Sequence, residues 1–343
     1  MRKLLNTLFV TSENRYLSLK NENVVVNEGD KTIASFPLIV LEGIVTFSYQ
    51  GASPALMGEC AKRGIGLVFM TPRGRFLCRV TGIDRGNVLL RKEQCLLSED
   101  DRRCAAIARN MIIGKIYNER WVLGRALRDH AMRVDQARIQ EVIAALNTAV
   151  KQLDGADNTE SIRGLEGEAA ARYYSVFDEL ILSQKSDFIF DTRNRRPPRD
   201  NVNALLSFAY VLLANDCTAA LESVGIDAYI GFLHKDRPGR ASLALDLEEE
   251  LRAPLADRFV LTLINNRVIQ DKHFDHQEDG AVLLNEEGRR VFLRAWQERK
   301  QETLTHPYLQ EKIPWGLVPY VQSLLLARYL RNDLDGYPPF LWK

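Results

Sequence analysis

The sequence lacks the features that mark several classes of protein. It has only five cysteines in 343 residues and no Cys-x-x-Cys pair, so neither a disulfide framework nor a cysteine-based zinc site is indicated. No run of 18 apolar residues predicts a transmembrane helix, and the basic-apolar start has no small-residue cleavage site. Charge is balanced too, with 46 Lys+Arg against 45 Asp+Glu, so net charge says nothing about nucleic acid. A reduced, cytoplasmic protein without a membrane partner is the expectation.

What is present is enough apolar material for a large core. Hydrophobic residues make up 46% of the chain and charged residues 27%, a globular composition, and the length favours two domains. The first part, residues 1–95, consists mostly of short segments rich in β-branched and aromatic residues, separated by turn signals. One helix interrupts them, with Ser53 as its N-cap, Pro54 at its first position and Gly64 after its last turn. We predict an antiparallel β-rich domain here.

The pattern changes to helical spacing from Ser98 onward. Ser98 and Asp101 form a plausible capping arrangement for a long helix. Further helices are predicted at about 137–153, 166–183, 202–222 and 242–252. The predicted fold is therefore α+β, with an N-terminal antiparallel β domain (1–95) followed by a larger all-helical domain (96–343).

Glu166 is the first candidate functional residue. It lies in the segment RGLEG (163–167), between Gly164 and Gly167, at the predicted start of a helix. Glycine weakens a helix by about 1 kcal/mol relative to alanine, so two glycines here suggest that something approaches the backbone closely. The alternative is an ordinary helix N-terminus, where a glutamate interacts favourably with the helix dipole.

The other candidates lie between residues 231 and 252. His234 belongs to a loop that starts at Gly231, and Asp246 and Glu249 share one face of the helix that follows. A structural histidine and a solvated acidic face are the alternatives. Together with Glu166, these side chains could form one divalent metal site, and oxygen-rich ligation with one imidazole suits Mg²⁺ or Mn²⁺. The spacing alone does not show that residues 166 and 249 meet.

Basic residues are clustered in two loops. Two prolines keep residues 191–200 extended, and the planar guanidinium of arginine matches phosphate geometry. A salt-bridged linker is the alternative. The candidate DNA contacts are Arg193, Arg195, Arg196 and Arg199 in this loop, and Lys235, Arg237 and Arg240 in the loop of His234. A third group, on the long helix after Ser98, includes Lys115 and could line a DNA path or form a solvent-exposed face.

One further histidine pair resembles a metal site. His273 and His276 have His-x-x-His spacing within Asp271–His276. A polar hairpin loop follows, and nothing apolar or glycine-rich shapes the segment. We interpret it as a polar turn.

Taken together, the motifs resemble a known family. RGLEG, GFLH (231–234) and LALDLEEELR (243–252), in this order, are similar to those of the CRISPR-associated integrase of spacer acquisition, the nuclease-like member of the universal adaptation pair. The segment NRRPPRDNVNALLSFAYVLL and the strand-rich opening extend the resemblance over essentially the whole chain. The length and the YPPFLWK ending look most like the type I subtype C branch.

The resemblance implies residue roles and a reaction. Glu166, His234 and Glu249 would be the metal ligands, and Asp246 would be a fourth catalytic residue, either as a ligand or beside one. The 3′-hydroxyl of a short captured DNA would attack a phosphodiester at a CRISPR repeat, and water in its place would make the same site an endonuclease.

The resemblance also implies partners: double-stranded DNA, a second copy of the chain in a homodimer that the N-terminal domain helps to form, and the small second CRISPR adaptation protein. Two alternatives stay open. One is a metal-dependent nuclease acting on branched or double-stranded DNA without integration, and the other is a non-catalytic DNA-binding scaffold.

Overall fold

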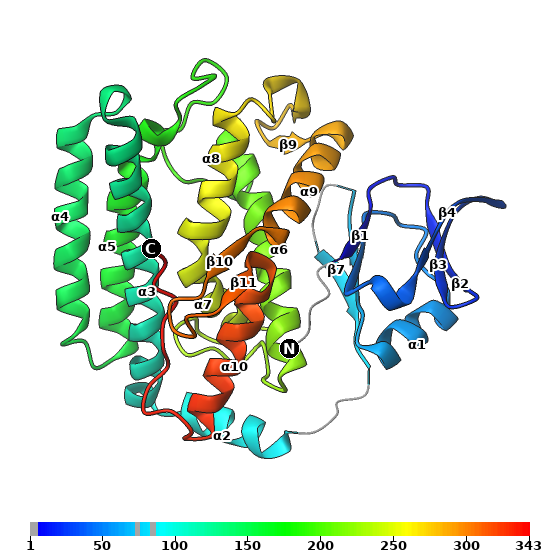
Figure 1. Ribbon diagram of the computed structural model, residues 1–343, viewed down its shortest axis with the longest axis horizontal. Helices are drawn as coiled ribbons and strands as arrows, with labels where there is room; N and C mark the ends of the chain where they lie inside the picture. The colour runs from blue at the N-terminus through cyan, green and yellow to red at the C-terminus, as the bar shows by residue number, and fades with distance from the viewer. Residues whose placement is uncertain (1–5, 73–75, 83–86) are drawn as a thin grey trace. The chain divides into compact units, whose positions relative to one another are not determined.

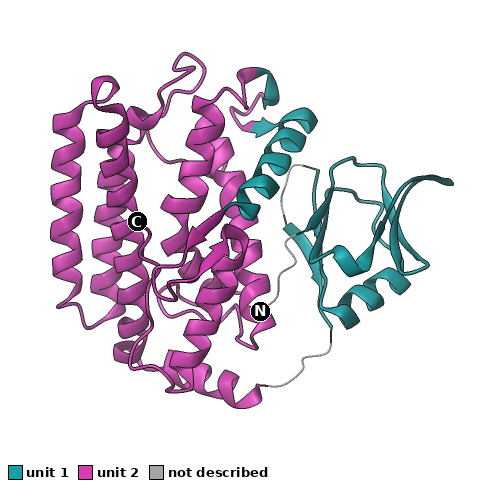
Figure 2. Ribbon diagram, viewed as in Figure 1, with its two compact units in different colours: residues 1–85, 272–275, 283–302 teal, residues 86–271, 276–282, 303–343 magenta. Residues whose placement is uncertain are grey.

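The computed structural model describes residues 6–72, 76–82 and 87–343, and the chain forms two compact units (Figure 2). Unit 1 comprises Met1–Arg85, Lys272–Asp275 and Leu283–Glu302, and unit 2 comprises the remaining segments, Gly86–Asp271, His276–Val282 and Thr303–Lys343. The segment Thr-Pro-Arg-Gly at residues 71–74 predicts a turn, and it extends beyond the described residues. Helix α2 (Val88–Ser98) is the first helix of unit 2 and spans residue 95, where we predicted the boundary between the two domains.

Unit 1 contains two sheets built from the predicted strands. The four-stranded sheet has the order β1–β5–β6–β7, and the three-stranded antiparallel sheet has the order β2–β3–β4. The strands are β1 (Thr7–Val10), β2 (Tyr16–Lys20), β3 (Asn23–Glu28), β4 (Lys31–Pro37), β5 (Gly43–Thr46), β6 (Gly66–Met70) and β7 (Phe76–Val80). The pairs β1–β5 and β5–β6 are parallel, which was not predicted. A parallel pair needs a crossover, and α1 (Pro54–Arg63) supplies it between β5 and β6.

The predicted caps of α1 are confirmed. The Ser53 hydroxyl accepts a hydrogen bond from the Leu56 amide, Pro54 is the first helical residue, and Gly64 has the left-handed φ of 68° that favours glycine. The apolar face of α1 buries Leu56 together with Leu17 and Ile44 from the sheets. This cluster is the core of the β-rich part of unit 1.

Unit 2 is largely helical, and the α+β class is confirmed. After α2 its helices are α3 (Asp101–His130), α4 (Gln136–Leu153), α5 (Thr159–Ser175), α6 (Asn201–Ser223), α7 (Ser242–Leu251), a π-helical segment η4 (Arg252–Asp257), α8 (Arg258–Asn265) and α10 (Val318–Leu330). It is not wholly helical, because it also holds the short antiparallel pair of β10 (Thr303–Thr305) and β11 (Lys312–Pro314). The hairpin of β8 (Phe274–His276) and β9 (Val282–Leu284) precedes α9 (Glu286–Gln301) in the chain.

Several predicted boundaries were wrong. Residues 88–95, which we predicted to belong to the β-rich part, lie in helix α2, and Ser98 ends this helix instead of capping the next one. The cap of α3 is Asp100, whose carboxylate accepts from the amides of Arg102 and Arg103. A carboxylate directly before the first turn accepts from two amides that have no partner within the helix, so Asp100 has the N-cap role that we predicted for Ser98.

The helices around the candidate site pack closely in unit 2. Helices α3, α4 and α5 lie side by side, and α7 packs between α3 and α6 (Figure 1). Helix α6 is long and apolar enough to cross a membrane, but most of it is buried inside unit 2, as expected of a core helix. Candidate residues on α3, α5 and α7 are therefore brought to one place by apolar packing.

Candidate active site

Glu166 lies inside α5, not at its start as predicted. The helix begins at Thr159, and its N-cap is Asn158, whose side chain accepts from the Ser161 amide. Glu166 is therefore two turns into the helix, and the helix-dipole interpretation does not apply to it. Apart from the adjoining backbone of α5 itself, nothing among the described residues lies within 4 Å of a Cβ added to Gly164 or Gly167, so the space beside these glycines is open.

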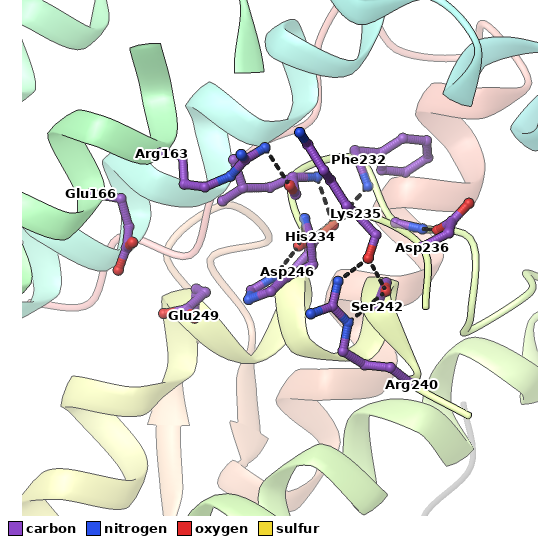
Figure 3. Close-up of polar contacts among 12 residues, drawn as sticks. Arg163, Glu166, Phe232, His234, Lys235, Asp236, Arg240, Ser242, Asp246 and Glu249 are labelled. Atoms are coloured by element: carbon purple, nitrogen blue, oxygen red, sulfur yellow. Dashed lines mark hydrogen bonds and ion pairs between the residues drawn. The ribbon is translucent and has the colours of Figure 1, made fainter. Parts of the chain in front are cut away.

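Lys115 links Glu166 to Glu249 at the centre of the site. Its ammonium forms an ion pair with Glu166 Oε1 and lies 2.8 Å from Glu249 Oε2. Figure 3 shows the carboxylate of Glu166 on α5 directed toward Glu249 on α7. Lys115 comes from α3 and is 5% exposed, so three helices contribute to one buried cluster of charges. The meeting of residues 166 and 249, which spacing could not establish, is thereby shown.

Charge balance keeps Glu249 ionised in this buried position. Burial raises its pKa, but the positive charges of Arg252 and Lys115 outweigh this effect and lower the pKa to about 2. Arg252 Nη1 lies 2.6 Å from Glu249 Oε1, and Arg252 Nε lies 2.9 Å from Glu248 Oε1. Burial lowers the pKa of Lys115, yet Glu249 and Glu166 raise that pKa well above its ordinary value. Glu249 and Lys115 are therefore both held in their charged forms.

His234 is fixed by Asp246. Its Nδ1 lies 2.6 Å from Asp246 Oδ1, and the same carboxylate accepts from the amides of Phe232, Leu233 and His234 (Figure 3). Because the Asp246 carboxylate accepts, Nδ1 is the donor, and in the neutral imidazole Nε2 then keeps its lone pair. Burial lowers the pKa of His234. The hydrogen bond and charge of Asp246 and the charge of Glu249 raise this pKa by more, so the net result is a pKa above the ordinary value of histidine. Asp246 thus acts beside a candidate ligand.

Gly231 allows this loop to close on α7. A Cβ at this position would meet the His234 carbonyl oxygen at 2.7 Å and Ser242 Cβ at 2.8 Å. Neither neighbour is the end of a flexible side chain, so any larger residue would push the loop away from the helix. The glycine of the GFLH segment is therefore a packing requirement for placing His234.

The donor set fits a hard divalent cation, although the side chains are not arranged around one. Two carboxylates and one imidazole suit Mg²⁺ or Mn²⁺. In the described ranges, no three His, Cys, Asp or Glu side chains cluster tightly enough to hold a metal ion. At this site Glu166 and Glu249 do not form such a cluster because the Lys115 ammonium lies between their carboxylates. The segment 271–276 forms no such cluster either. His276 Nε2 lies 3.6 Å from Asp271 Oδ1, whereas His273 is buried and its Nε2 lies 3.7 Å from Glu287 Oε1.

Comparisons with known proteins identify the family. Residues 8–298 match the family model described as CRISPR associated protein Cas1. The chain is 47% identical to CRISPR-associated endonuclease Cas1 1 of Chlorobaculum tepidum and 48% identical to CRISPR-associated endonuclease Cas1 2 of Rhodospirillum rubrum, in each case over all of both chains. The chain belongs to the Cas1 family.

Solved structures share the Cas1 fold. A Cas1 protein from Thermotoga maritima superimposes with a TM-score of 0.81 at 22% identity, covering 98% of this chain and 100% of that one. A casposase bound to integration product gives a TM-score of 0.84 at 22% identity, covering 98% and 93%. The arrangement of strands followed by helices is therefore that of Cas1 structures.

The basic residues of this Cas1 family member differ in their availability. Arg193 donates to Asn203 Oδ1 at 2.7 Å and to Ser207 Oγ at 3.2 Å, and its guanidinium lies 5.3 Å from the centre of the Tyr210 ring. It therefore serves an internal contact. The remaining arginines of its loop, Arg195, Arg196 and Arg199, have exposed side chains.

The second basic loop is divided in the same way. Lys235 and Arg237 are exposed, whereas Arg240 is half-buried and donates to the Lys235 carbonyl and to Ser242 Oγ (Figure 3). Both loops thus present exposed cations and use one arginine to hold their own shape.

Sequence reasoning missed Arg252 and the buried tyrosines behind it. Arg252 stacks 4.9 Å above the Tyr210 ring, and the Tyr210 hydroxyl donates to Asp257 Oδ1 at 2.5 Å. Tyr173 donates to the other oxygen of Asp257 at 3.1 Å. This layer supports Arg252, which in turn holds Glu249. An arginine one turn after a buried acidic run was the available signal.

Proposed function

We propose that the chain is a metal-dependent DNA integrase and endonuclease that inserts short captured DNA fragments into a CRISPR array. The observation that carries the proposal is the convergence of Glu166, His234 and Glu249, from α5, a loop and α7, in a member of a family whose relatives are named CRISPR-associated endonucleases. The structural neighbour named as a casposase bound to integration product supports integration as the reaction.

The residues of the chain would divide the work. Glu166, Glu249 and His234 Nε2 would hold Mg²⁺ or Mn²⁺, and Asp246 would keep the imidazole aligned. A bound divalent ion would supply neutralisation of phosphate charge and orientation of the attacking oxygen. The exposed cations Arg195, Arg196, Arg199, Lys235 and Arg237 would hold the DNA backbone.

Partners and context complete the proposal. One structural neighbour is part of a complex that its name describes as Cas6-RT-Cas1–Cas2, which supports a second adaptation protein as partner. From the sequence alone we also propose a homodimer, a cytoplasmic location and membership of the type I subtype C branch.

The test is strand transfer of a short duplex with free 3′-OH ends into a supercoiled plasmid that carries a repeat. Wild type, Glu166→Ala and Glu168→Ala are compared with Mg²⁺ or Mn²⁺, with and without the second adaptation protein. Glu168 is the matched control, because it lies on the same helix and its side chain is 68% exposed. We expect metal-dependent joined product that disappears only in Glu166→Ala.

Other outcomes would select the alternatives. Cleavage without joining under every condition would favour a nuclease without an integration role. Tight DNA binding without any chemistry would favour a scaffold. Loss of the helical circular dichroism signal in Glu166→Ala would show that Glu166 is structural.

A further inference from the structure

Lys115 occupies the place that the proposed metal site requires. Its ammonium pairs with Glu166 Oε1 and Glu249 Oε2, and the other oxygen of Glu249 is taken by Arg252. A divalent ion at these carboxylates would therefore meet a buried positive charge a few ångströms away. In a poorly solvated site such repulsion is strong, so the ion and the ammonium compete for the same oxygens.

A displaced ammonium needs another partner, because an unpaired buried charge is costly. Glu119 provides one. It lies on α3 one turn after Lys115, is 3% exposed, and its Oε2 has no hydrogen-bond partner among the described residues. Residues four apart on a helix are neighbours, so the flexible lysine side chain can reach Glu119 without movement of the backbone.

We infer that Lys115 is a resident counter-charge that holds Glu166 and Glu249 together without metal and moves to Glu119 when a divalent ion binds. This inference rests on the proposed metal-dependent function. It gives a role to Oε2 of the buried Glu119, which has no hydrogen-bond partner among the described residues although Lys115 lies one helical turn away. Lys115 and Glu119 would then set the metal affinity without being ligands.

The test measures Mn²⁺ affinity of the full chain by isothermal titration calorimetry. The variants are Glu119→Gln, Lys115→Met and the double variant, with Glu141→Gln on the exposed face of α4 as matched control. We expect Glu119→Gln to weaken Mn²⁺ binding at least fivefold, because the amide oxygen can accept from the displaced ammonium but cannot balance its charge. In the Lys115→Met background the same substitution should have no effect, and Lys115→Met alone should bind Mn²⁺ more tightly than wild type.

Two results would overturn the inference alone: an unchanged affinity in Glu119→Gln, or an equal loss with and without Lys115. Failure of wild type to bind Mn²⁺ would overturn the proposed metal site as well, so the two failures are distinguishable. Crystal structures of wild type with and without Mn²⁺ keep the test independent of variant folding. We expect Lys115 Nζ within hydrogen-bond distance of Glu119 only with Mn²⁺, and an unmoved Lys115 would contradict us.

Discussion

Asp246 fixes both the backbone and the imidazole of the loop that carries His234. Its Oδ1 accepts from the amide and from Nδ1 of His234, and its Oδ2 accepts from the amides of Phe232 and Leu233. The side chain is 1% exposed, so water cannot replace these bonds. One carboxylate therefore organises four donors, which explains why an acidic residue is buried at this position of α7.

We predict that Asp246→Asn destabilises the protein by about 1–3 kcal/mol, the cost of leaving buried donors unpaired. Either orientation of the amide places an NH₂ group against two N–H donors. His234 would also lose its alignment, so Mn²⁺ binding should weaken. Chemical denaturation and calorimetric titration measure the two effects. Asp236→Asn is the control, because Asp236 is an exposed carboxylate in the same loop. Variants that both match wild type would refute the role of Asp246.

Asp257 links stability to pH. Burial raises its pKa, and although hydrogen bonds from Tyr210 and Tyr173 lower it, the net result is a rise from 3.8 to about 6. The folded state therefore holds this proton more tightly than the unfolded chain does. The stability that Asp257 contributes is fully present below pH 3.8 and is lost as the pH rises through 6.

We predict that Asp257→Asn removes this pH dependence. Between pH 4 and pH 7 the free energy of unfolding of the variant relative to that of wild type should rise by about 2–3 kcal/mol, most of the equivalent of the shifted pKa. The difference between the two unfolding free energies, measured by urea denaturation at each pH, cancels the contributions of other carboxylates. Parallel stability curves over this range would contradict the prediction.

At the scale of elements, α5 carries two glycines that the free protein does not need. A side chain at Gly164 or Gly167 would meet nothing within 4 Å, and neither residue has a positive φ. Glycine in such a helix costs about 1 kcal/mol relative to alanine. The sequence predicted that some group closely approaches the backbone of α5 at these glycines. No neighbouring element of the described chain does so, and the open space beside Glu166 can accommodate a ligand.

We predict that Gly164→Ala raises stability by up to about 1 kcal/mol while weakening DNA binding, because the added methyl group narrows the open surface of α5. Gly124→Ala on α3 is the matched control, since it also lies in open space within a helix but away from Glu166. Thermal denaturation and a DNA-binding titration separate the two effects. Unchanged DNA binding in Gly164→Ala would show that no ligand approaches there.

The sequence predicts the helices and strands better than it predicts their boundaries or the contacts between them. Periodicity identified α6 and α7 closely, because their apolar stripes are long, but the start of α5 depends on Asn158, a local cap that precedes the glycines. That α5 and α7 meet is a long-range contact without a local signal. The sequence does hold a signal for Lys115, however. With Glu119 it interrupts an apolar stripe of α3, whose buried residues include Ala108, Met111, Ile112 and Val122. Charged side chains in such a stripe are rarely buried without a partner.

At the scale of the whole molecule, the C-terminal segment is part of the helical core of unit 2. Glu250 on α7 accepts from the Tyr337 hydroxyl and from the Phe340 amide at 2.8 Å. Asn118 on α3 donates to the Phe340 carbonyl at 2.8 Å and accepts from the Trp342 amide at 2.9 Å. The segment thus ties α3 to α7, the two helices that carry Lys115 and Glu249.

We predict that deleting residues 337–343 destabilises the protein by several kcal/mol and weakens Mn²⁺ binding. Buried Tyr337 and Phe340 each contribute roughly 1.5–3 kcal/mol of apolar burial, and Glu250 and Asn118 would lose the hydrogen bonds that this segment supplies. Deleting Lys343 alone, which is exposed, is the control. If the truncated chain does not fold, Tyr337→Phe tests the same link, because it removes only the hydroxyl that Glu250 accepts from. A truncated chain that melts and binds Mn²⁺ like the control would show that α3 and α7 are held by their own packing, and the C-terminal segment would then have no part in positioning Glu249.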